Sequence, residues 1–210
     1  PGHRWWRHKA AGEGLVDFAL HPADTAAAVA SAQARGLAIH GPLDGGRLRP
    51  DGQRLQWQSA FAEAPELPFL CGDVTPRELR VPHGLAAVHV NGISGIFRVT
   101  VAVRDLDAAA ARYGALLGHG PLIEPGRRLF KLAGSYIALQ APGADLPESA
   151  AVQARLERRG EGIPVLLKKF EEAIGGQLPS HRVRQILALT EDTSRFEATP
   201  VHRFMDLFSA

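Results

Sequence analysis

Polar residues alternate with valine along one strand-like run and offer candidates for ligand binding. Val99, Val101 and Val103 suit a face that packs against helices. Arg98 and Thr100 should therefore point to the other face of the strand. An arginine held there could bind a carboxylate or a phosphate through two parallel hydrogen bonds. Alternatively, Arg98 lies at the open end of the strand, in solvent or in a surface ion pair.

Other polar side chains on strand-like runs could contact a polar ligand, or could simply face solvent. Arg54, Gln56 and Gln58 share one face of a run whose other face carries Leu55, Trp57 and Phe61. Lys131 lies between two apolar residues of a later run. The candidates of this kind are Arg54, Gln56, Gln58, Lys131 and Gln140.

The histidines and the single cysteine do not form a recognisable catalytic group. Nine histidines are scattered along the chain. His40 and His119 each begin a His-Gly-Pro-Leu tetrapeptide. They are either a repeated acid–base pair or, as we favour, markers of the turn into a strand. Cys71 lies in an apolar run and is expected in the core rather than as a nucleophile. We therefore assign no catalytic residue.

Composition excludes several classes of protein. The 210 residues are 45% hydrophobic, and 24 Lys and Arg against 22 Asp and Glu give a net charge of +2. This charge is too small for an electrostatic nucleic-acid binder. One cysteine forms neither an intramolecular disulfide nor a cysteine-rich zinc site. We expect no membrane span, no signal peptide and no membrane partner, and a cytoplasmic location.

The elements that must position these residues occur twice in the same order: strand, helix, then three strands. The first unit covers residues 12–75, and the second covers residues 94–142 after a linker at 76–93. Glycine and proline at Gly45-Gly46 and Pro50–Gly52 indicate turns. The sequence therefore predicts an α+β protein of tandem βαβββ units with a curved mixed sheet.

The ends of the chain differ from the two units. Residues 1–11 look like a linker segment. Gly160-Glu161-Gly162 repeats Gly12-Glu13-Gly14, so residues 143–167 should contain a helix followed by the start of a partial third copy. Residues 168–210 predict a helical extension, with helices near 170–174, 182–189 and 201–208. Its apolar residues should cover a sheet edge or form a contact in a homo-oligomer.

The tandem units resemble the vicinal oxygen chelate superfamily, and within it the glyoxalase-like domain proteins. The residues that carry the resemblance lie within residues 12–163. They are Leu15–Leu20, Arg49–Gly52 before Leu55–Trp57, Leu67–Leu70, His89–Gly92 and Arg98–Asp107. The resemblance implies paired sheets that form a cup, with helices on the convex side and a ligand on the concave side.

The resemblance also implies a divalent metal, held by a histidine early in the first strand and a glutamate in the last strand of each unit. Carried over to this chain, those positions fall on Val16, Gly72, Arg98 and Ala138. None of these side chains can bind a metal as the family does. We therefore expect no metal and no other cofactor, with Arg98 as the fixed cation in place of the metal.

Two classes of function fit these observations. In the first, the concave face binds a small anionic molecule, either as a sequestering protein or as a metal-independent enzyme of the glyoxalase-like lyase or isomerase type. In the second, the units are degenerate, the cup is filled by side chains, and the tail mediates assembly. An open, polar-lined cup of a few hundred Å³ would favour the first class.

Overall fold

The first unit contains one helix and a four-stranded sheet. A computed structural model describes residues 5–12, 14–87, 95–143, 145–146, 148–164, 180–191 and 203 of the chain. The elements of the first unit are β1 (Ala19–Leu20), α1 (Thr25–Ala34), β2 (Ile39–Leu48), β3 (Arg54–Ala62) and β4 (Phe69–Asp73). The sheet order is β1-β4-β3-β2, with β1 parallel to β4 and the other pairs antiparallel. α1 begins where the carboxylate of Asp24 accepts a hydrogen bond from the N–H of Ala27.

The second unit repeats this arrangement. Its elements are β5 (Arg98–Ala102), α2 (Leu106–Leu117), β6 (Leu122–Glu124), β7 (Arg127–Leu132) and β8 (Ser135–Gln140). The sheet order is β5-β8-β7-β6, and β5 runs parallel to β8. α2 is capped by the carboxylate of Asp105 and ends at Gly118, whose φ of 80° suits glycine. The tandem βαβββ prediction is therefore confirmed.

One predicted turn is wrong. Gly45 and Gly46 lie inside β2, which continues to Leu48. A Cβ atom on Gly45 would lie 2.4 Å from Nε1 of Trp57 on the neighbouring strand. Glycine is therefore used here for close approach to an indole ring rather than for a turn. The chain turns just beyond, where Gly52 has a φ of 81°.

β1 is shorter than the predicted strand at residues 15–20. The carboxylate of Asp17 accepts a hydrogen bond from the N–H of Phe18 at 2.8 Å and another from Nε1 of Trp5 at 2.9 Å. A local bond of this kind takes a backbone donor away from strand pairing. Regular pairing with β4 therefore begins only at Ala19.

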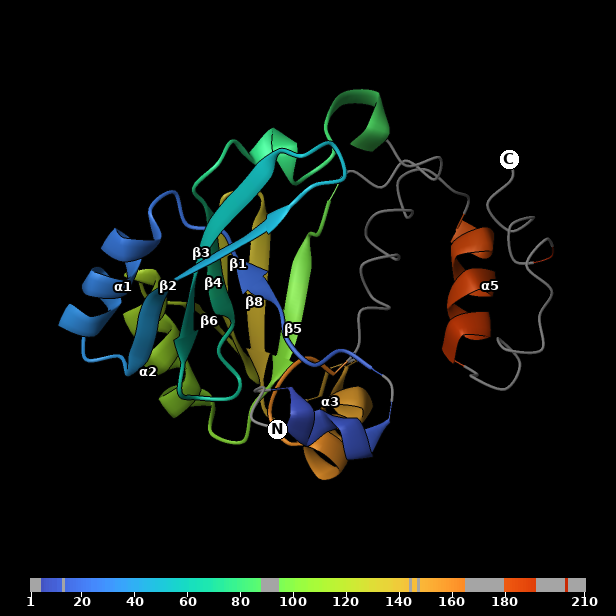
Figure 1. Ribbon diagram of the computed structural model, residues 1–210. Coiled ribbons are helices and arrows are strands. Elements are labelled where there is room, and N and C mark those ends of the chain that lie inside the picture. Colours follow the sequence, from blue (N-terminus) through green and yellow to red (C-terminus); the bar gives the residue numbers. More distant parts are fainter. Residues whose placement is uncertain are drawn as a thin grey trace.

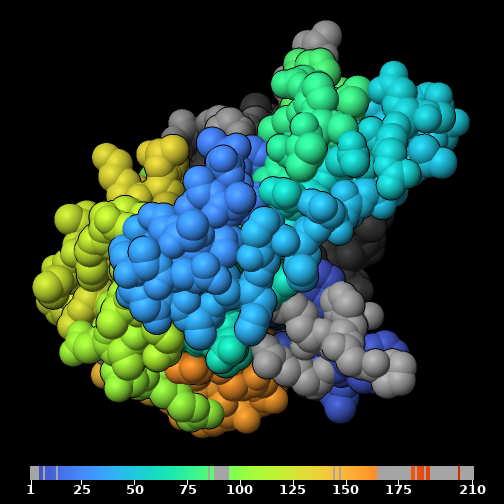
Figure 2. Space-filling view, turned by 60° about the vertical axis from the view of Figure 1, so that its left-hand side comes forward, coloured from blue at the N-terminus to red at the C-terminus, as the bar shows by residue number. Residues whose placement is uncertain are grey.

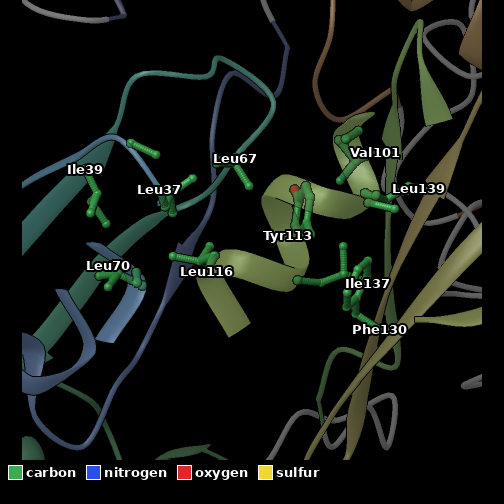
Figure 3. Packing of buried hydrophobic residues seen from close by; sticks show 14 of the residues in the cluster. Leu37, Ile39, Leu67, Leu70, Val101, Tyr113, Leu116, Phe130, Ile137 and Leu139 are labelled. Atoms are coloured by element: carbon green, nitrogen blue, oxygen red, sulfur yellow. The ribbon is translucent and has the colours of Figure 1, made fainter. Parts of the chain in front are cut away.

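One hydrophobic core joins the two units. α1 and α2 lie together on one side of the sheets (Figure 1), and buried residues of both units belong to the same cluster. Tyr113 of α2 is fully buried between Leu67 of the first unit and Phe130 of the second (Figure 3). Its hydroxyl donates to the backbone carbonyl of Glu66 at 2.8 Å, and burial raises the pKa of Tyr113 well above its usual value. The space-filling view shows the two units in contact, with the β2–β3 hairpin projecting from them (Figure 2).

Helix α3 (Ser149–Arg159) packs on the second sheet, on the face turned away from α2. We call this the far face of the sheet. Val152 and Leu156 of α3 are buried against Ala102 of β5. The prediction of a helix in this segment is confirmed. The helix therefore covers one end of the surface on which the resemblance placed a ligand.

The glycines of the repeated Gly-Glu-Gly segments have matching backbone angles. Gly12 and Gly160 have φ values of 76° and 74° and the same ψ of −163°, and Gly14 and Gly162 have φ values of 143° and 135°. Each segment follows a helix, the first one the 3-10 helix η1 (Trp6–Ala11) and the second one α3. Gly162 exchanges two backbone hydrogen bonds with Ala102, on the edge of β5 that does not pair with β8.

The remaining described elements are all helices. Two 3-10 helices, η2 (Arg77–Leu79) and η3 (Gly84–Ala87), lie in the predicted linker. Helix α5 (Ser180–Glu191) includes the helix predicted at 182–189. The predicted helix at 170–174, most of the predicted helix at 201–208, and residues 165–167 of the predicted partial third copy lie outside the described residues. No helix in the described part of the chain is both long enough and apolar enough to cross a membrane.

Candidate functional site

Arg98 and Thr100 lie on the far face of β5, as the alternation with valine predicts. Val101 and Val103 are buried in the core on the side of α2. The guanidinium of Arg98 forms an ion pair with Glu148 at 3.0 Å, and the two side chains are 17% and 10% exposed. Glu148 immediately precedes α3. The cation that was expected to bind a ligand therefore pairs with a carboxylate of the same chain.

Gln140 shares this face and also contacts α3. It pairs with Ala102 in the β5–β8 ladder, is almost completely buried, and its amide lies 3.4 Å from the hydroxyl of Ser149. Lys131 pairs with Tyr136, which also pairs with Arg98, so Lys131 lies at the Arg98 end of the same face, and it is exposed. The structure therefore places Arg98, Thr100, Gln140 and Lys131 on one face of the sheet. Glu148, just before α3, contacts Arg98, and Ser149, the first residue of α3, contacts Gln140.

Arg54, Gln56 and Gln58 do not join that group. They lie on the face of β3 that also carries Ala60, which is buried in the core beside α1. Gln58 donates to the carboxylate of Asp44 at 3.0 Å. These residues therefore form a polar extension of the helix-packed face in the first unit.

A cluster that the sequence analysis did not single out lies where β1 and β4 end. His21 follows β1, and its Nε2 atom lies 2.9 Å from Oδ2 of Asp73, the last residue of β4. Nε of Arg80 donates to Oδ1 of Asp73, and Nη1 of Arg77 donates to Oδ2 at 3.1 Å. Because β1 and β4 are parallel neighbours, the residues that follow them meet at one end of the sheet. No sequence motif indicates that His21 and Asp73 meet. The predicted parallel pairing of the first and last strands of the unit could have indicated it.

The Asp73 carboxylate is buried and strongly stabilised in its ionised form. Its side chain is only 7% exposed. The hydrogen bond from Arg80 lowers the pKa of Asp73 to about 2, with smaller contributions from Arg77 and His21, although burial opposes the shift. Asp73 is therefore an acceptor of hydrogen bonds throughout the physiological pH range.

A cavity of about 750 Å³ lies at the seam between the two units. Its walls come from the segment around β1, from β8 and the turn before it, and from the helices α1 and α2. Most of the walls are apolar, including Leu20, Leu70, Val99, Leu116, Leu132 and Ile137. The polar residues that line it are Asp17, His21, Ser135 and Tyr136. The described residues that line it include no lysine and no arginine.

The residues present do not fit the divalent metal that the resemblance implies. The nearest approach to a ligand pair is His21 with Asp73, but two arginines donate to that carboxylate and bring positive charge to it. Within the described residues, no three side chains of His, Cys, Asp or Glu gather as a cation site would require. We therefore derive no chemistry through a metal.

The two repeated histidines lie on the surface. Nε2 of His40 lies 3.0 Å from the carboxylate of Glu63, and both side chains are exposed. Nδ1 of His119 lies 3.0 Å from the carbonyl of Gly120, just after α2 ends. Neither histidine contributes to the walls of the seam cavity. Their geometry agrees with the interpretation as turn markers.

Comparison with known proteins identifies the family. The sequence model of the glyoxalase-like domain matches residues 1–117, which is more than half of the chain. The chain belongs to the glyoxalase-like domain family, and the resemblance to the vicinal oxygen chelate superfamily is confirmed.

One solved structure is similar in fold, and a second one matches more weakly. A hypothetical protein of Staphylococcus aureus superposes with a TM-score of 0.51 at 13% identity, over 66% of this chain and 58% of that one. A glyoxalase family protein of Bacillus cereus matches with a TM-score of 0.30 at 16% identity, over 62% of this chain and 97% of that one. These identities are too low to indicate a shared ligand or activity.

Short sequence matches also exist to curated enzymes. The 2-methylcitrate dehydratase of Cupriavidus necator is 38% identical over 52 residues, and that of Salmonella typhimurium is 37% identical over 51 residues. These matches cover about a quarter of this chain and 11% of each enzyme. A match of this extent does not transfer the dehydratase activity to this chain.

Proposed function

We propose that this glyoxalase-like domain protein binds a small molecule in the seam cavity. The observation that supports the proposal is the cavity itself. Its volume of about 750 Å³ and its apolar walls with a few polar groups are typical of ligand sites. The proposal keeps the small-molecule class that the sequence favours, but places the ligand at the seam rather than beside Arg98.

The walls of the cavity indicate the class of ligand. Most of the lining residues are apolar, and Asp17, His21, Ser135 and Tyr136 add a few polar groups. The cavity therefore suits a molecule with an apolar body. The anionic ligand predicted at Arg98 stays a separate prediction, in which the ligand would have to compete with Glu148.

A cavity-filling variant tests the proposal. Ala28 of α1 lines the cavity, whereas Ala30 of the same helix is exposed. Ala28→Phe should block binding of the apolar probe indene, and Ala30→Phe should not. At ten times its Kd, indene should stabilise the unmodified protein by about 1.4 kcal/mol, or raise its Tm by about 3 to 5 °C. Failure of indene to bind the unmodified protein would refute the proposal.

A structural role is the second candidate. It is favoured by the packing of α3 on the far face of the second sheet, where Val152 and Leu156 cover Ala102. In this case the family's ligand surface in the second unit would be a helix-packing surface. The protein would then show no stabilisation by indene, and also none by a small carboxylate or by inorganic phosphate.

A further inference from the structure

His21 connects the buried Asp73 cluster to the seam cavity. His21 is one of the residues that line the cavity, and 40% of its side chain is exposed. Nε2 of the imidazole lies 2.9 Å from Oδ2 of Asp73. One ring nitrogen is therefore held by the protein, in a residue that borders the space proposed for a ligand.

The state of Asp73 decides which nitrogen of a neutral His21 carries the proton. The pKa of Asp73 is about 2, so the carboxylate has no proton to donate near neutral pH. A hydrogen bond between the two groups then requires that Nε2 of His21 carries the hydrogen. In the neutral ring, the lone pair must be on Nδ1.

Arg77 and Arg80 complete this arrangement from the other side of Asp73. Both donate to the carboxylate, so Asp73 is held in place and its charge is compensated. The carboxylate can therefore orient the imidazole without adding net negative charge at the cavity. Asp73 acts here as a positioning residue, because it reaches the cavity only through His21.

We propose that Nδ1 of His21 accepts a hydrogen bond from the ligand of the seam cavity. The ligand would then be a molecule with an apolar body and an N–H or O–H donor. This inference rests on the proposed function and adds the orientation of the ligand. It also assigns the Asp73 cluster a role, which is to fix the tautomer of His21.

The test compares indole with indene, which have nearly the same shape but differ in the N–H donor. Their Kd values are measured by NMR titration of the full chain and of His21→Phe. His40→Phe serves as the control, because His40 is also paired with a carboxylate but does not line the cavity. The ratio of the Kd for indene to the Kd for indole should fall about fivefold in His21→Phe and stay unchanged in His40→Phe. A ratio that does not change in His21→Phe would overturn the inference.

Two further readouts keep the inference separate from the proposed function. Indene should bind His21→Phe about as well as it binds the unmodified protein, which would show that the cavity is intact when the donor preference is lost. If neither compound binds the unmodified protein, the cavity proposal fails and this inference fails with it. Nitrogen-15 spectra of the imidazole need no ligand, and a proton on Nδ1 instead of Nε2 in the neutral ring would overturn the inference alone.

Discussion

Replacing Asp73 with asparagine should destabilise the protein near neutral pH, and this pH-dependent cost should disappear in acid. The pKa of Asp73 is lowered from 3.8 to about 2, mainly by the hydrogen bond from Arg80 and then by Arg77, against the opposing effect of burial. The folded state therefore favours the ionised carboxylate more than the unfolded chain does. This contribution is fully present above pH 3.8 and is lost as the pH falls through about 2.

The size of the effect follows from the pKa shift and from the exposure of the partners. A lowering from 3.8 to about 2 corresponds to about 2.4 kcal/mol at most. Arg80 and Arg77 are 28% and 47% exposed, so solvent screens part of the interaction. We therefore expect Asp73→Asn to lose about 1 to 2 kcal/mol of pH-dependent stability.

Urea denaturation of both proteins from pH 7 down to about pH 2 measures this difference. The free energies of unfolding should differ by a constant amount down to about pH 4 and should then converge. Asp51→Asn is the control, because Asp51 pairs with Arg49 at 3.0 Å but is 44% exposed. A difference between Asp73→Asn and the unmodified protein that stays the same over the whole range would refute the reasoning.

Two further predictions concern Arg98 and Gly45. Arg98→Ala leaves the nearly buried carboxylate of Glu148 without this ion pair, so it should lower the free energy of unfolding by about 2 kcal/mol in urea denaturation. A small loss, together with a Tm shift by inorganic phosphate that Arg98→Ala abolishes, would instead support an anion site. Gly45→Ala should cost about 1 to 3 kcal/mol and alter Trp fluorescence, because the added Cβ would lie 2.4 Å from Nε1 of Trp57. Unchanged stability and fluorescence would contradict the proposed close approach.

Much of the fold could be predicted because its signals are local. The helix α2 begins at the acidic cap Asp105 and ends at Gly118, and both residues lie next to the helix in sequence. The alternation around Val101 likewise fixes which side of β5 faces the core. The function of Gly45 could not be predicted in this way. It depends on Trp57, which reaches it only after β2 and β3 have paired.

The candidate site was predicted less well, because its contacts join distant parts of the chain. Alternation correctly placed Arg98 and Thr100 on one face, but it could not indicate that Glu148, fifty residues later, would reach Arg98. The resemblance drew attention to Val16 and Gly72 as functional positions. The polar pair that forms in the first unit is instead His21 with Asp73. They follow or end β1 and β4, and the parallel pairing of these strands brings them together.

The two Gly-Glu-Gly segments show where local sequence stops determining structure. Their glycines adopt almost the same backbone angles in both copies. The chain that follows pairs differently. Gly162 bonds to Ala102 on β5, and in this antiparallel register residue 164 would pair with Thr100. Residue 164 is proline, which has no N–H to donate, so the ladder cannot continue through that pair. Within the described residues, the edge of β5 that does not pair with β8 therefore receives a single bridge, at Ala102.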